Sequence, residues 1–189
     1  MSNIFGRRAA AVLTCALLAA GWARADIDFG TALPALIKIL AYDVNFDARG
    51  VGPFTVLVVN EPSQAKQRDE LVTALKALAA LKIKTRPVAW VSYEYRDEAG
   101  LQAEIDRSHA AALLVVPGMT MPVVKSVWDV AQDNQLYALA LEAQMVEQLL
   151  PVGVTMSGDK PQIIINEKSA KAVGVRFDTA VLRVARVVQ

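Results

Sequence analysis

The stretch that decides the fold reads FTVLVVN and covers Phe54–Asn60. Its apolar and β-branched residues follow one another without the polar alternation of a half-exposed strand, which is typical of a strand covered on both faces. The turn-forming sequence GVGP at 50–53 precedes it, and a long helical stretch follows from Ser63 to about Lys82. The segment therefore predicts a central strand of a parallel sheet followed by a crossover helix.

The alternation of strands and helices continues along the chain and changes near its end. We predict further strands over 83–91, 111–116 and 136–141, and helices over 31–46, 97–107 and 122–132. The runs 152–157 and 162–165 predict a hairpin at the sheet edge, and helices are predicted after Glu167 and after Asp178. Right-handed crossovers between parallel strands place helices on both faces. The predicted fold class is α/β: a single three-layer α/β/α domain, with a mostly parallel sheet, a C-terminal edge hairpin and two C-terminal helices.

The first 25 residues are predicted to be a cleaved signal peptide. Arg7 and Arg8 form a cationic start, an apolar run from Ala9 to Ala20 follows, and the sequence Ala-Arg-Ala at 23–25 offers a cleavage site. The apolar run is too short to span a bilayer as a helix. We therefore expect a periplasmic protein, at most peripheral to the membrane, whose domain covers residues 26–189.

The composition excludes several classes of protein. The chain of 189 residues is 54% hydrophobic, too apolar for disorder, and its only cysteine, Cys15, lies in the predicted signal peptide. The exported part then has no thiol for a disulfide, for catalysis or for a metal site. It keeps 17 basic and 19 acidic residues without a run of like charge, so we expect no nucleic-acid partner.

The residues that usually carry catalysis are scarce. His109, the only histidine, precedes the third predicted strand, whereas open α/β sheets bind ligands at the carboxyl ends of strands. Phosphate-binding, hydrolase and zinc motifs are absent from the sequence. The sequence DVNFD at 43–47 resembles the start of a calcium loop, but Ala48 and Phe54 occupy the positions of its glycine and glutamate. We predict a polar helix end there, no metal, no cofactor and no enzymatic activity.

The carboxyl ends of the predicted strands are the default place for a binding site, because these ends share one edge of the sheet. Polar or adaptable residues follow three of the strands there. The candidate ligand- or partner-binding residues are Asn60, Glu61, Ser63, Gly118, Met119, Thr120, Glu142 and Gln144. The structural alternative is that these residues cap helices, form turns and fill gaps in the core.

Two segments resemble a known family. The sequence ILAYDVNF at 39–46 resembles the aromatic-Asn-Phe motif that closes the first helix of the YfiR/HmsC-like periplasmic regulators. The sequence PQIIINEKSAKAVGV at 161–175, with LRVARVV at 182–188, resembles the ending of the same family. The similarity covers nearly the whole predicted domain. The Ile-Asn to Gly ending also recurs in ABC substrate-binding proteins, which have two lobes and roughly twice this length.

The resemblance implies a regulator without catalysis. Proteins of this family bind the periplasmic sensor domain of an inner-membrane diguanylate cyclase or histidine kinase and restrain it. Two features depart from the family: GVGP at 50–53 replaces the Trp-Pro that often follows the first motif, and the cysteines of some members are absent. The alternative is a small-molecule binding protein that resembles one lobe of an ABC substrate-binding protein. A homodimer is compatible with either function.

Overall fold

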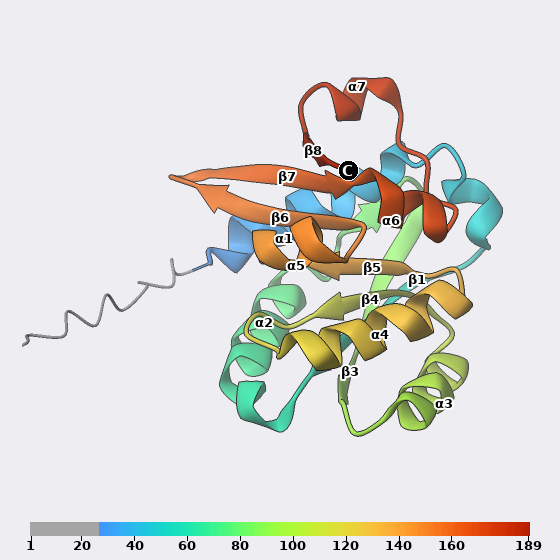
Figure 1. The fold of residues 1–189 in the computed structure, drawn as a ribbon, viewed down its shortest axis with the longest axis vertical. Coiled ribbons are helices and arrows are strands. Elements are labelled where there is room, and N and C mark those ends of the chain that lie inside the picture. Colours follow the sequence, from blue (N-terminus) through green and yellow to red (C-terminus); the bar gives the residue numbers. More distant parts are fainter. Residues whose placement is uncertain (1–26) are drawn as a thin grey trace, which may run out of the picture.

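The computed structural model describes residues 27–189, which form one sheet with helices on both faces (Figure 1). The predicted signal peptide, residues 1–25, lies outside the described residues. Between residues 27 and 189, none of the helices has the length and apolar character needed to cross a membrane. The described residues confirm the predicted three-layer α/β/α class.

The sheet has the strand order β2-β3-β1-β4-β5-β6-β7-β8. Strands β3, β1, β4, β5 and β6 are mutually parallel, β2 and β7 pair antiparallel with β3 and β6, and β8 runs parallel to β7. The strand bounds are β1 Phe54–Asn60, β2 Lys82–Ile83, β3 Arg86–Glu94, β4 Ala110–Val115, β5 Tyr137–Ala140, β6 Val152–Ser157, β7 Lys160–Asn166 and β8 Arg186–Val188.

The chain leaves β1 in one direction across the sheet, to β3, and then returns past β1 to β4, β5 and β6. Because right-handed crossovers in opposite directions place their helices on opposite faces, α2 and α4 cover different sides of the sheet. Helix α1 packs with α2, and α3 packs with α4. The α-helix bounds are α1 Phe29–Ile39, α2 Ala65–Ala77, α3 Glu98–Ser108, α4 Met121–Asp133, α5 Ala143–Gln148, α6 Glu167–Ala172 and α7 Thr179–Leu182.

The core is centred on β1, whose seven residues are all buried. This burial agrees with the uninterrupted apolar pattern of the strand, because helices cover both of its faces. At its amino end, Phe54 stacks on Phe46 with ring centroids 5.6 Å apart and meets the ring of Tyr137 at 5.8 Å. These rings close the core beneath the turn that follows α1.

Three elements differ from the sequence prediction. The strand predicted over 83–91 is a hairpin: β2 ends at Ile83, Lys84 turns the chain with φ 53°, and β3 extends to Glu94. Helix α5 was not predicted, since its six residues are too few to show a helical period. The first helix is also shorter than predicted, because it passes into 3₁₀ turns at Leu40–Tyr42 and Phe46–Arg49.

The C-terminal ending is the largest correction. Helix α7 stops at Leu182, and Arg186–Val188 forms β8 beside β7 instead of continuing the helix. The β6–β7 hairpin therefore lies inside the sheet rather than at its edge, and β8 forms the edge. Pairing with β7 satisfies the backbone groups of a short valine-rich segment that a four-residue helix could not extend.

Candidate functional site

The carboxyl ends of β1 and β4 form the topological switch point of the sheet. From β1 the chain turns to β3 on one side, and the next parallel strand, β4, lies on the other side of β1. In open α/β sheets a crevice opens where the strand order reverses in this way. Five of the eight candidate residues belong to these two ends: Asn60, the last residue of β1, Glu61 directly after it, and Gly118, Met119 and Thr120 after β4.

Glu61 and Thr120 join the two ends directly. The backbone N–H of Thr120 donates to Glu61 Oε2 at 2.6 Å, and the Thr120 hydroxyl donates to Oε1 at 3.1 Å. Thr120 is the N-cap residue of α4 and makes no side-chain cap of its own. The Glu61 carboxylate therefore takes over a free N–H at the helix start, where the helix dipole favours a negative charge.

Gln64, which is not among the eight candidate residues, completes this cluster. Its side-chain N–H donates to the carbonyl oxygen of Gly118 at 3.0 Å, and the Asn60 amide donates to the carbonyl of Glu61 at 2.9 Å. The amide oxygens of Asn60 and Gln64 are buried and have no hydrogen-bond partner among the described residues. Unsatisfied buried acceptors are rare in folded proteins, so this edge holds two acceptors suited to a donor from outside the chain.

The remaining candidates have different surroundings. Ser63 is exposed in the 3₁₀ turn Pro62–Gln64, and Met119 is 5% exposed and belongs to the core. Glu142 is half-buried and Gln144 exposed, and both line a separate depression of about 320 Å³. Its other lining residues are Ile27, Leu141, Ala143, Thr155 and Met156. The predicted set is thus divided between the switch point and a second hollow after β5.

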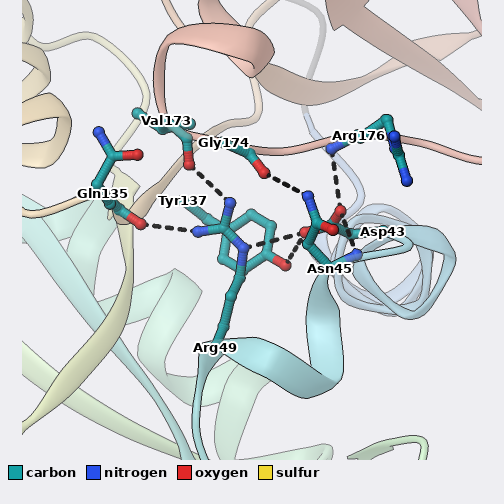
Figure 2. A network of polar contacts seen from close by, with 8 residues as sticks. All are labelled: Asp43, Asn45, Arg49, Gln135, Tyr137, Val173, Gly174 and Arg176. Carbon is teal, nitrogen blue, oxygen red and sulfur yellow. Dashed lines mark hydrogen bonds and ion pairs between the residues drawn. The ribbon is translucent and has the colours of Figure 1, made fainter.

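A buried carboxylate organises the turn after α1, as Figure 2 shows. The side chain of Asp43 is fully buried. Its Oδ1 accepts the backbone N–H groups of Asn45 and Arg176, both at 3.0 Å. Its Oδ2 accepts Arg49 Nε at 3.0 Å and the Tyr137 hydroxyl at 2.6 Å. The segment predicted to be a polar helix end is therefore a hydrogen-bonded turn around one buried carboxylate, whose oxygens accept hydrogen bonds from the protein itself.

The same turn is tied to the C-terminal part of the chain. The Asn45 amide donates to Gly174 O at 3.0 Å, and the Arg49 guanidinium donates to Val173 O at 2.6 Å and Gln135 O at 2.7 Å (Figure 2). Arg49 also lies over the ring of Tyr137, 4.5 Å from its centroid. The contact between Asn45 and Gly174 joins the two segments on which the family resemblance rests.

The buried environment of Tyr137 changes the pKa of its hydroxyl group. Burial of the phenol, reinforced by its hydrogen bond to the Asp43 carboxylate, raises the pKa of Tyr137 far above the ordinary value of 10.0. The hydroxyl therefore stays protonated and remains a donor throughout the physiological range.

Residues 27–189 hold no group of three or more His, Cys, Asp or Glu side chains that could bind a metal ion.

Comparison with known proteins defines the class of the fold. The chain resembles an ABC domain from Streptococcus pneumoniae solved in complex with L-Trp (TM-score 0.59, 13% identity, 84% of this chain and 62% of that one). It also resembles a substrate-binding protein with adhesive properties from Clostridium difficile (0.56, 17%, 72% and 54%) and a conserved domain protein from Vibrio cholerae (0.61, 13%, 86% and 60%).

These neighbours share the α/β fold of this chain. The chain spans between 54% and 62% of the neighbours' lengths. No family model matches the sequence, and no curated protein matches it. At 13–17% identity the likeness concerns the fold alone.

Proposed function

We propose that this protein is a non-catalytic periplasmic regulator that binds the sensor domain of an inner-membrane signalling protein, a diguanylate cyclase or a histidine kinase, and restrains it. The observation that carries the proposal is the contact between the two segments that resemble the YfiR/HmsC-like family. Asn45 of the first segment donates to Gly174 O of the second, and the backbone N–H of Arg176, directly after the second segment, donates to the buried Asp43 of the first. Two motifs whose bonded residues are 129 positions apart in the sequence thus stabilise the same turn, as expected if both belong to the pattern of one family.

The carboxyl edge of the sheet is the surface we assign to the partner. Within residues 27–189, exposed Ser63 and Gln144 lie along this edge. The Glu61–Thr120 pair fixes the ends of β1 and β4, so the edge is pre-formed and binding needs little ordering. The edge carries no reactive histidine or cysteine, which supports contact rather than chemistry.

The proposal is tested by deletion and complementation in the source organism, with cyclic-di-GMP and biofilm as readouts and co-purification from envelope extracts as the binding assay. Deletion should raise signalling output. Gln144→Arg should fail to complement and fail to retain a membrane sensor, because a long charged side chain obstructs the edge. Gln132→Arg makes the same change on an exposed residue near the C-terminal end of α4 and should behave as wild type.

Unchanged output on deletion, together with no membrane sensor in the purified complex, would refute the regulatory role. Equal complementation by Gln144→Arg and Gln132→Arg would refute the assignment of the edge.

A second function, small-molecule binding, is favoured by the buried amide oxygens of Asn60 and Gln64 at the switch point. The substrate-binding fold supports it, and the tryptophan complex of one neighbour suggests amino acids as the first ligands to screen. A ligand at 100 times its Kd stabilises the folded state by about 2.7 kcal/mol, which a thermal-shift screen detects. Gln64→Leu should abolish the shift. No shift with any amino acid would contradict this function without affecting the regulatory one.

A further inference from the structure

A wide hollow lies at the opposite edge of the sheet, where the parallel strands begin. It has a volume of about 990 Å³, which is within the range of small-molecule sites. The turn between Asn45 and Pro53, the starts of β4 and β5, and Val173–Gly174 form its walls. None of the eight candidate residues lies there, and the proposed function makes no use of it.

The charged side chains around this hollow are all basic. Arg49 and Arg86 line it together with His109, and no aspartate or glutamate does. The charge of Arg49 is balanced by Asp43. Arg86 has no ion pair within residues 27–189: its Nε and Nη2 donate to the carbonyls of Gly52 and Pro53, at 2.8 and 3.2 Å. The hollow therefore carries an uncompensated positive charge.

Arg86 is held in place with donor capacity left over. Its guanidinium carbon lies 5.4 Å from the ring centroid of Phe46 and 5.3 Å from that of Phe54. Its Nη1 is buried and has no hydrogen-bond partner among the described residues. An unpaired guanidinium nitrogen beside a concave surface is the arrangement that a carboxylate or phosphate oxygen satisfies.

His109 adds a second donor at the same place. It ends α3 in the left-handed conformation, with φ 50°, a position that glycine usually occupies. A bulky side chain kept in a strained backbone conformation often marks a functional position. The imidazole is exposed, lines the hollow and donates an N–H in either protonation state.

We propose that this hollow is a binding site for a small organic anion, whose carboxylate or phosphate group lies against Arg86 and is bound by His109. The absence of lining acids removes the repulsion that would exclude such a ligand, and the concave shape favours a small molecule over a flat macromolecular surface. The site is independent of the carboxyl edge, so it can fail without affecting the proposed function.

The single histidine makes the test direct, because its Cε1–H NMR signal reports on this hollow alone in the tag-free protein. Inorganic phosphate, succinate and citrate are titrated separately at constant pH and ionic strength, with sodium chloride as the reference. We expect a saturable movement of the His109 signal with millimolar or tighter affinity for at least one of them. Saturation by phosphate alone or by the carboxylates alone identifies the anionic group.

Two variants locate the site. Arg86→Gln should weaken the best anion by about tenfold or more, as expected when one charge-assisted hydrogen bond is lost. Lys66→Gln removes one exposed positive charge on α2, away from the hollow, and should change the affinity little. If Arg86→Gln does not fold, His109→Asn serves as the second variant, because asparagine accepts the left-handed backbone conformation. His109→Asn removes the NMR reporter, so anion binding is then followed by the rise in Tm that the best anion causes in the wild type. The variant should abolish that rise.

Movement of the His109 signal that never saturates with any of the three anions, or that sodium chloride reproduces, would overturn the proposal. Equal weakening by Lys66→Gln and Arg86→Gln would also overturn it, since binding would then follow the general charge of the protein rather than this hollow.

Discussion

Replacing Asp43 by asparagine tests the central role of the buried carboxylate. The substitution keeps the size of the side chain, and the remaining oxygen can still accept the N–H groups of Asn45 and Arg176. The new amide nitrogen, however, takes the place of Oδ2, which now accepts from Arg49 and Tyr137. The N–H of Arg49 Nε and the hydroxyl of Tyr137 then both point at an N–H donor instead of an acceptor, and the positive charge of Arg49 loses its negative partner.

The expected loss follows from those two contacts. A hydrogen bond to a charged group contributes about 1.5–3 kcal/mol, so two such bonds amount to about 3–6 kcal/mol. The Arg49 side chain is 15% exposed, and water therefore recovers part of its solvation. We expect the free energy of unfolding to fall by about 3–4 kcal/mol, a large part of the 5–15 kcal/mol typical of a domain.

Urea unfolding followed by tryptophan fluorescence and circular dichroism measures this loss. With an m-value of about 2 kcal/mol per M, the midpoint should fall by about 1.5–2 M. Asp47→Asn is the matched control, because it makes the same change in the same turn on a side chain that is 77% exposed and paired only with Lys84. It should lower the stability by less than about 1 kcal/mol. Equal midpoints for the two variants would refute the assignment of Asp43 as the organising group.

Two further predictions concern Tyr137 and Gly153. The raised pKa of Tyr137 means that the unfolded chain ionises this phenol above pH 10 while the folded chain does not, so its contribution to stability is complete below pH 10 and is lost as the pH rises. Tyr137→Phe should therefore show a smaller decrease in stability between pH 9 and 11 than wild type, and an equal decrease would contradict this. Gly153→Ala places a methyl group 2.5 Å from Val146 Cγ2 and 2.8 Å from Ala140 O, and should destabilise the fold by about 1–3 kcal/mol. An unchanged Tm for Gly153→Ala would contradict this prediction and would show that β6 and α5 can move apart at little energetic cost.

The fold class could be predicted because it depends on local patterns. The buried run at Phe54–Asn60 and the strand–helix alternation define a parallel sheet without knowledge of distant contacts. The rule that ligands bind at strand carboxyl ends also selected Glu61 and Thr120, which the structure joins by hydrogen bonds. Gln64 could have been selected by the same rule, since it lies only four residues after the end of β1.

The role of Asp43 could not be predicted in the same way. Its partners Tyr137 and Arg176 lie 94 and 133 residues away, so no local spacing reveals them. The basic hollow could not be predicted for a similar reason, because Arg86 and His109 line one hollow only when β3 and β4 are placed on either side of β1. Strand β8 was predicted as helix because its apolar spacing fits a helical period, and only pairing with β7 decides otherwise.

The turn at Asp43 also determines when the domain can finish folding. A ribosome or a translocation channel delivers the polypeptide from its N-terminus, so the carboxylate emerges long before Arg176, its last donor. Until then the nascent domain has an incomplete interior and pays the chain entropy of a very long closing loop. Because this last donor lies so near the end of the sequence, completion of the turn waits until nearly the whole domain has been delivered.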